Sequence, residues 1–514
     1  MSMTWLANVD RDTFWAHHAW SEFASLTAKD RSLVILPLFG FADHGLGLPL
    51  DAEELLGSSV IRHAVIQAGN TVPCQVLPPV RFGLAPYPNT FFGLDVETAY
   101  ALLHEVASGV KAAGFDRLVF INTSPWNREL VNNASRDIRI ALKLQTFIVN
   151  ASALGFDFHP ASSKRAPAQA AVAHLLGKPA ATSKRPADVR DADFRPGCFP
   201  QPAPLAPDPS IDGAAILNAA GQHLARLLAD IQARAPLGST THRPVNALPN
   251  LQNPPNQFIF PERYRTRYLP ALTRDELDAI PNKEQALVIL PTGAIEQHGH
   301  HLPVGVDAIL GQAWLENILP LLASDAPVYV APPLTYGKSN EHHAFAGTLS
   351  LSFGTFRRSL LAIATQLQAL GFRQLAVLNT HGGNSPVIIS TLREIQTTLG
   401  LRAGMLGWPF KPELPAQEAA YGFHAGDWET SLMLAVAGEL VTMSKAVCEY
   451  PAQLSDLGEL RPEDAPAIFS WSTDDISHSG VMGDATAATH EKGRRWLEAQ
   501  SAAVARRIEE LLGK

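Results

Sequence analysis

Short apolar runs that end at turn-forming residues recur along this chain of 514 residues. Residues 288–290 are Val, Ile and Leu, and residues 374–378 are again mostly apolar. Runs of this length, rich in aliphatic residues and bounded by Pro or Gly, predict buried strands of a parallel sheet. Helical spacing of apolar residues at 211–233 predicts a long helix, and another is expected at 487–512. The pattern therefore favours an α/β fold.

The apolar runs belong to a repeat that covers both halves of the chain. Residues 34–37 and 44–49 align without gaps onto residues 288–291 and 298–303. Further identical residues follow in the middle of each half, where the alignment of the two halves shifts once by a few residues. Self-similarity over such a length indicates a tandem duplication, so we expect two α/β domains of the same kind.

Proline-rich sequence separates the two copies. Prolines cluster between residues 196 and 261, and the Pro and Asn residues of 246–261 disfavour both helix and strand pairing. We predict a first domain at 1–245, a linker at 246–261 and a second domain at 262–514. A short helix capped by Thr273 is expected near the start of the second domain.

Composition excludes several classes of protein. The formal charge of −8, from 41 basic and 49 acidic residues without a basic run, argues against nucleic acid as a partner. Cys74, Cys198 and Cys448 are few, odd in number and far apart, which fits a reducing compartment and gives no metal-binding spacing. The first residues lack the pattern of a signal peptide, and no stretch is apolar enough to span a membrane. We expect a cytoplasmic protein without membrane contact.

Histidines and carboxylates follow the predicted strands of the second copy. Ligands of α/β proteins sit beyond the carboxyl ends of the strands, and carboxylate with imidazole suits a hard or borderline divalent metal. A single Glu-x-His in a loop is usually only solvated, but here three separate loops of one half carry such residues. The candidates in chain order are Glu296, His298, Asp307, His381, His424 and Glu429.

Four motifs within residues 262–514 resemble the creatininase family of metal-dependent amidohydrolases. They are Glu296-Gln297-His298-Gly299 running on to Asp307, His381-Gly382-Gly383-Asn384, His424-Ala425-Gly426 with Glu429-Thr430-Ser431, and Gly480 to Asp484. The resemblance implies two tandem three-layer α/β/α domains with mostly parallel sheets. It also implies hydrolysis of a non-peptide carbon–nitrogen bond, in a cyclic amide or a formamide, by a metal pair such as Zn, Mn or Fe. Members of the family assemble as oligomers, so we expect a homo-oligomer.

The candidate residues divide into two ligand sets. A carboxylate between two cations can bridge them, and Asp307 is the natural candidate for this role. One ion would take Glu296 and His381, the other His298 and Glu429. His424 is then expected to shuttle a proton to the leaving nitrogen, since its ordinary pKa lies near neutrality.

Two departures from creatininase itself argue against creatinine as the substrate. The present chain has Gly383 where creatininase carries a ligand Glu, and Phe423 where it carries a Glu before the shuttle histidine. Glu429 would have to supply the missing ligand, and we also count it among the catalytic residues. The nearest alternatives are a metallopeptidase acting on a small modified peptide and a non-catalytic metal-binding scaffold.

The first copy has lost most of these residues. Ala42 stands at the position of Glu296, Glu53 at that of Asp307 and Ser124 at that of His381, so that only His44 survives clearly. His159 is a weak match for His424. Ligand number and charge set metal affinity, so we expect no metal in this half. We hypothesise that the fused copy replaces a neighbouring subunit and shapes the rim of the pocket.

Spare histidines occur close to the predicted site. We expect them to line the pocket or bind substrate, or else to lie on the surface, rather than to hold metal. They are His300, His301, His342 and His343.

Overall fold

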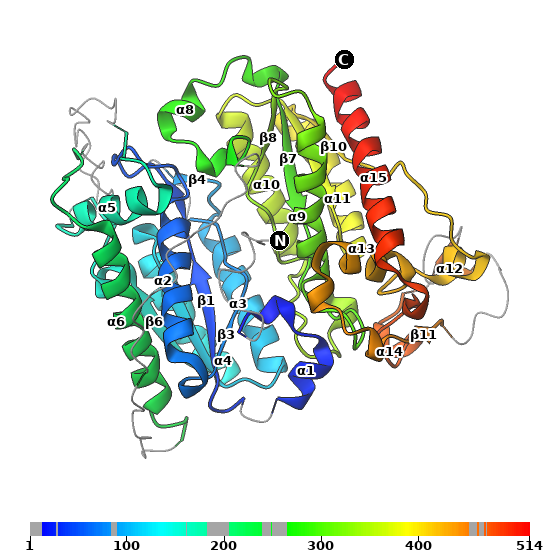
Figure 1. Ribbon diagram of the computed structural model, residues 1–514, viewed down its shortest axis with the longest axis horizontal. Coiled ribbons are helices and arrows are strands. Elements are labelled where there is room, and N and C mark those ends of the chain that lie inside the picture. The colour runs from blue at the N-terminus through cyan, green and yellow to red at the C-terminus, as the bar shows by residue number, and fades with distance from the viewer. Residues whose placement is uncertain are drawn as a thin grey trace.

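Two α/β units lie side by side in the computed structural model (Figure 1). The structure describes residues 13–26, 29–83, 90–160, 162–181, 205–238, 248, 265–451, 460–461, 467–468 and 470–513. The linker predicted at 246–261 falls outside the described residues, Leu248 excepted, so the predicted domain boundaries stay predictions.

A four-stranded parallel sheet forms the centre of the first unit. Its strands follow the order β3-β1-β5-β6. Their bounds are β1 (Leu33–Leu38), β3 (Cys74–Val76), β5 (Arg117–Asn122) and β6 (Gln145–Asn150). Every residue of β1 and β5 is buried, as expected for central strands that are covered on both faces.

The sheet of the second unit repeats this arrangement. Its strands are β7 (Leu287–Thr292), β8 (Val328–Val330), β9 (Gln374–Asn379) and β10 (Arg402–Met405), in the order β10-β9-β7-β8. All pairings are parallel, and β7 lies between β8 and β9 as β1 lies between β3 and β5. The two sheets therefore share one topology.

Helices cover both faces of each sheet and give each unit three layers (Figure 1). In the first unit α2 (Ala52–Ala68), α5 (Arg165–Leu176) and α6 (Gly213–Ala233) pack together, and α3 (Val96–Ala112) packs on α4 (Arg128–Leu142). In the second unit the matching groups are α9 (Val306–Ile318), α13 (Asp427–Ala437) and α15 (His490–Leu511), and α10 (Phe353–Ala369) with α11 (Ser385–Leu399). The predicted fold class of two α/β domains is confirmed.

Local sequence signals place several helix ends. The short helix α8 (Arg274–Asp278) begins after Thr273, whose hydroxyl oxygen accepts a hydrogen bond from the Glu276 amide, while the Glu276 carboxylate accepts one from the Thr273 amide. The alanine-rich residues 165–176 form the helix α5. The remaining short elements are α1 (Trp20–Ser25), β2 (Phe41–Ala42), β4 (Thr90–Phe91), α12 (Ala416–Tyr421), β11 (Cys448–Glu449), β12 (Leu460–Arg461), β13 (Ala467–Ile468), α14 (Thr473–Ile476) and β14 (Gly483–Asp484).

The segment that opens the first unit crosses to the second. The Thr13 carbonyl accepts a hydrogen bond from the Val76 amide of β3 at 2.7 Å, within its own unit. The Ala16 carbonyl then accepts from the Gly305 amide at 2.9 Å, and the His18 carbonyl accepts from the Val304 amide at 2.8 Å. The chain thus joins both units before β1 begins.

The segment that opens the second unit makes the reciprocal crossing. The Pro270 carbonyl accepts from the Asp51 amide at 2.8 Å, and the Leu272 carbonyl accepts from the Leu50 amide at 3.0 Å. The Arg265 guanidinium adds an ion pair with the Asp51 carboxylate at 2.9 Å. The two units therefore exchange their first segments about an approximate two-fold axis, as two copies of one subunit would.

Each helix of the described ranges is too short or too polar to cross a bilayer.

Candidate metal centre

Two neighbouring strands of the second sheet deliver the site residues. β7 ends at Thr292, and the loop that follows carries Glu296 and His298 before α9 brings in Asp307. His381 comes two residues after β9, which pairs with β7 in parallel. Because the carboxyl ends of parallel strands meet at one edge of the sheet, the two loops lie together there. Buried Ile289 and Leu290 of β7 fix the strand that positions the first loop.

Two groups of ligand atoms share Asp307. The Nδ1 of His381 lies 3.1 Å from Oε1 of Glu296 and 3.7 Å from Oδ2 of Asp307. The Nε2 of His298 lies 3.7 Å from Oδ1 of Asp307 and 3.8 Å from Oε2 of Glu429. Within each group the ligand atoms all lie within 4.8 Å of one another. Each Asp307 oxygen therefore faces one histidine, the arrangement expected of a bridging carboxylate.

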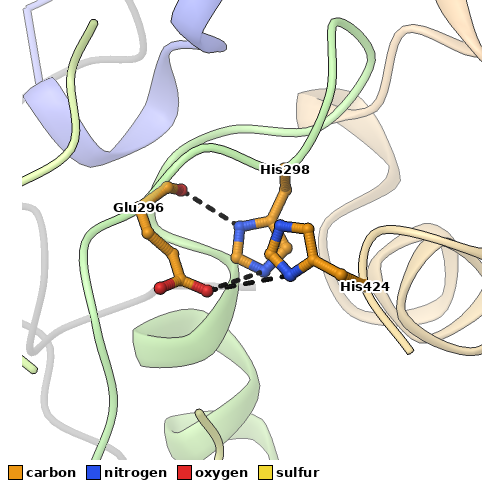
Figure 2. Close-up of side chains that lie close together, drawn as sticks. All are labelled: Glu296, His298 and His424. Carbon is orange, nitrogen blue, oxygen red and sulfur yellow. Dashed lines mark hydrogen bonds and ion pairs between the residues drawn. The ribbon is translucent and has the colours of Figure 1, made fainter. Parts of the chain in front are cut away.

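The loop before α13 brings His424 to the same place. Figure 2 shows the rings of His298 and His424 lying together, with the Glu296 carboxylate facing both. The ring centroids are 4.4 Å apart, and the His424 Nδ1 lies 3.8 Å from the Glu296 Oε1. The structure thus brings together all six residues predicted from the sequence.

Backbone carbonyls fix the orientation of the three histidines. In His298, the ring nitrogen on the side away from the carboxylates, Nδ1, lies 3.0 Å from the Glu296 carbonyl oxygen. The corresponding nitrogen is Nε2 in the other two histidines. It lies 3.0 Å from the Lys338 carbonyl oxygen in His381 and 2.8 Å from the Gln297 carbonyl oxygen in His424. A carbonyl oxygen only accepts, so we assign the N–H of each neutral ring to this nitrogen. The opposite nitrogen then keeps its lone pair on the side of the carboxylates, where an ion held between them would accept it.

Buried polar atoms at the centre fit a cation. Among the described residues, the Glu296 Oε2, the His298 Nε2 and the Asp307 Oδ2 are buried and have no hydrogen-bond partner. Leaving such atoms unsatisfied is costly in the interior of a protein. Oxygen and imidazole nitrogen together suit divalent transition metals. The residues therefore fit one or more divalent ions.

The protonation of the centre reflects crowded charges. Burial and the nearby Glu296 carboxylate raise the pKa of Asp307 to about 7. Burial favours the neutral form of His298, but Glu429 and Asp307 outweigh it and raise the His298 pKa to about 9. The three nearby carboxylates repel one another and favour a proton on His298, and a cation bound between the ligands would take the place of that proton.

Glu341 is a site residue that the sequence reasoning missed. Its Oε1 lies 3.5 Å from the His381 Nε2, and its Oε2 accepts a hydrogen bond from the Lys338 Nζ at 2.9 Å. A Cβ atom at Gly383 would lie only 2.0 Å from that Oε1. The glycine thus leaves room for the Glu341 carboxylate beside the ligand histidine. In the sequence, the one indication that Glu341 belongs to the site is that it directly precedes His342, a histidine expected near the pocket.

The spare histidines have different surroundings. His342 is buried, stacks on His424 at 4.4 Å between centroids and places its Nε2 3.6 Å from the Glu296 Oε1. Burial lowers the His342 pKa to about 3, so the ring is neutral. His301 is also buried, with its Nε2 2.8 Å from the Thr430 hydroxyl, whereas His343 is exposed. His342 therefore lines the centre, as one of the alternatives predicted.

The corresponding place in the first unit holds a histidine–carboxylate pair. The His44 Nε2 lies 3.1 Å from the Glu53 Oε1, and the Glu53 Oε2 accepts a hydrogen bond from the Gly40 amide at 2.5 Å. In the described part of this unit, no three histidine, cysteine or acidic side chains gather as they do around Asp307. Phe158 stacks on His44 at 4.5 Å, as His424 lies on His298. The counterpart of His424 is thus Phe158 rather than the weakly matched His159.

The family of the chain follows from comparison with known proteins. The sequence model of the Creatininase family, described as creatinine amidohydrolase, matches residues 16–186 and 270–508. The chain therefore belongs to the creatininase family, and the predicted resemblance is confirmed. Both halves carry the family's sequence pattern, which accords with their shared topology.

Individual relatives each match about half of this chain. The mycofactocin precursor peptide peptidase of Mycolicibacterium smegmatis is 31% identical over 212 residues, 41% of this chain and 78% of that protein. The creatinine amidohydrolase of Pseudomonas putida is 30% identical over 253 residues, 45% of this chain and 92% of that protein. A solved structure of creatininase with Mn is 28% identical and covers 48% of this chain and 98% of that chain, with a TM-score of 0.38.

Proposed function

We propose that the second half hydrolyses the carbon–nitrogen bond of an amide, using two divalent ions held by the residues around Asp307. The observation that carries the proposal is that each oxygen of this buried carboxylate faces its own histidine–carboxylate group. Zn, Mn or Fe would suit these donors. The proposed ligands are Glu296, His298, Asp307, His381 and Glu429.

Bound ions would polarise the amide carbonyl and lower the pKa of a water molecule. His424 has the geometry of a proton carrier beside them. Its Nε2–H is engaged by the Gln297 carbonyl, which leaves the lone pair of Nδ1 directed toward Glu296. A neutral imidazole in this position can accept a proton on Nδ1 and deliver it to the leaving nitrogen.

Glu429 links the proton carrier to the proposed second ion. Its Oε2 accepts a hydrogen bond from the Ala425 amide at 2.5 Å and faces the His298 Nε2. Ala425 follows His424 directly and has a φ of +54°, an unusual backbone conformation for alanine. Glu429 therefore orients the His424 loop, which supports its place among the catalytic residues.

Small amides, cyclic amides or formamides, are the substrates we propose. His424 is buried and Glu429 is largely covered, and Phe423 and Trp471 add aromatic rings 5.7 Å apart beside His342. Such surroundings favour a compact, weakly charged substrate. The peptidase relative favours a second candidate, the cleavage of a small modified peptide.

Hydrolysis by the metal-loaded protein tests the proposal. Cyclic amides, N-formyl compounds and short peptides would be offered to the wild type and to His424→Ala. We expect turnover of one class, and a loss of about 10²- to 10⁴-fold in the variant with its metal content unchanged. Turnover of peptides alone would select the second candidate. No turnover of any class by protein with full metal content would favour the non-catalytic scaffold.

Other expectations from the sequence stay predictions. They are the homo-oligomer, the cytoplasmic location and the absence of nucleic-acid and membrane partners.

A further inference from the structure

One tryptophan of the first unit reaches the loops around the metal centre of the second. The ring of Trp20, at the start of α1, lies 4.6 Å from that of His300 and 5.0 Å from that of Phe345, the latter edge to face. Its indole N–H donates a hydrogen bond to the Ser479 carbonyl at 3.3 Å. In Figure 1, α1 (blue) lies beside the orange part of the second unit.

Each loop that Trp20 contacts carries a part of the centre. His300 belongs to the loop of Glu296 and His298, and Phe345 follows Glu341 and His342 within one turn. Ser479 precedes Gly480, whose carbonyl accepts a hydrogen bond from the Gln297 side chain at 3.0 Å. A single side chain therefore joins three loops that are far apart in the sequence.

The third loop also holds the backbone of the proton carrier. The Met482 amide donates to the His424 carbonyl at 2.9 Å, and the His424 amide donates to the Met482 carbonyl at 3.2 Å. A shift of this loop would move the imidazole relative to Glu296. The Trp20 contact with Ser479 thus acts on His424 through only a few residues.

The backbone around Trp20 holds the ligand loop as well. The Ala16 and His18 carbonyls accept hydrogen bonds from the amides of Gly305 and Val304, two and three residues before Asp307. A Cβ atom at Gly305 would lie 2.5 Å from the Ala16 carbonyl oxygen, which shows how closely the two chains approach. The Trp15 indole N–H adds a hydrogen bond to the Gly347 carbonyl at 2.9 Å.

We propose that residues 13–26 of the first unit hold the loops of the metal centre of the second unit in place, with Trp20 as the positioning residue. The indole fixes the spacing of the three loops and so preorganises the ligand atoms for divalent ions. The proposal rests on the proposed function in one respect, that the centre binds such ions. It gives the fused copy, which lacks the ligand set itself, a role in the chemistry of its neighbour.

The approximate two-fold symmetry supplies a matched control. Arg274 holds the place of Trp20 in the reciprocal segment, and its guanidinium lies 5.2 Å from the ring of Phe91, the counterpart of Phe345. Arg274 thus packs against the first unit, which holds the His44–Glu53 pair, and not against the metal centre. Substituting Arg274 disturbs an equivalent crossing without touching the loops of the centre.

Cobalt binding tests the role of Trp20. Co²⁺ would be titrated into metal-free wild type, Trp20→Ala, Trp20→Phe and Arg274→Ala, with visible absorption as the readout. We expect Trp20→Ala to weaken binding by about tenfold, the lower end of the effect of outer-shell partners, and to alter the Co²⁺ spectrum. Trp20→Phe keeps the ring contacts and should recover most of the affinity. Arg274→Ala should match the wild type in both readouts.

Hydrogen exchange of the wild type tests the same coupling without a substitution. The His18 amide bonds to the Trp15 carbonyl, and the Leu272 amide bonds to the Leu269 carbonyl, both at 3.2 Å. Because coupling between sites is reciprocal, Co²⁺ should slow exchange at His18 and leave Leu272 unchanged. Equal behaviour of the two amides would overturn the inference, as would identical Co²⁺ binding by Trp20→Ala and Arg274→Ala. Failure of the wild type to bind Co²⁺ would instead overturn the proposed function.

Discussion

The two units place different chemistry on one scaffold. In the second, His298 lies within 4 Å of three carboxylates, those of Glu296, Asp307 and Glu429. In the first, Glu53 is the one carboxylate of the described residues that lies within 4 Å of His44, at 3.1 Å. Both histidines follow the same strand of the same sheet topology. The fold therefore persists without the ligand set, because a few side chains at the strand ends determine the site.

The difference also shows how a buried site can persist after ligands are lost. Glu53 retains a hydrogen bond from the Gly40 amide, and its Oε1 lies 3.1 Å from the His44 Nε2. Phe158 covers the histidine where the second unit has His424. A single histidine–carboxylate contact thus remains where the second unit has its ligand groups, and neither of its two facing atoms has a hydrogen-bond partner among the described residues.

Removal of the shared carboxylate should give the largest effect. Asp307→Asn removes one negative charge from both ligand groups, so we expect the affinity for divalent ions to fall by more than about a hundredfold, beyond what outer-shell changes cost. Metal titration monitored by calorimetry would measure it. The matched control is Glu53→Gln at the corresponding position of the first unit. An equal loss of affinity in both variants would contradict the division of roles between the units.

Breaking the pair of the first unit should affect stability rather than metal. His44→Ala leaves the buried Glu53 carboxylate without its partner, and we expect the free energy of unfolding to fall by about 3 kcal/mol. Chemical denaturation of the metal-free protein would measure it, with the half-buried His104→Ala as control. Loss of bound metal from His44→Ala without loss of stability would show that the first unit holds an ion after all.

Restoring two ligands should give the first unit some of the metal binding that we expect of the second. Ala42→Glu together with Ser124→His would rebuild around Glu53 the counterpart of the group formed by Glu296, Asp307 and His381. We expect one additional divalent ion, bound more weakly than the native ions because the new side chains must be accommodated in a packed interior. Equilibrium dialysis would count the ions, and each single variant serves as a control. If the double variant binds no additional ion, differences in the backbone, and not only in the side chains, prevent the first unit from binding metal.

The smallest effect is expected at Glu341. Its carboxylate lies beside the His381 nitrogen that faces away from the centre, so Glu341→Gln should weaken metal binding by about tenfold. The exposed Glu498→Gln provides the control in the same titration. If the affinity for divalent ions is unchanged, the role of Glu341 is limited to its ion pair with Lys338.

Sequence reasoning succeeded where the information is local. The ends of β7 and β9 follow from apolar runs that stop at turn residues, and the candidate ligands stand within the loops just beyond. The Thr273 capping box likewise lies within four residues. Parallel pairing of the two strands then suffices to bring Glu296 and His381 together.

The features that the sequence did not reveal depend on distant contacts. Glu341 reaches His381 only because its loop folds over Gly383, and Trp20 reaches the centre only because the units exchange their opening segments. Phe158 lies on His44 as His424 lies on His298, a match that was missed because the sequence offers no clear partner for His424 in the first half. No local pattern encodes such contacts.

The metal content of the wild-type chain tests the central claim most directly. Elemental analysis of protein purified without chelator, beside His381→Ala, would measure it. The account predicts near two equivalents per chain, largely lost in the variant. Near four equivalents would contradict the metal-free first unit, and none, even after metal is added back, would contradict the metal centre itself.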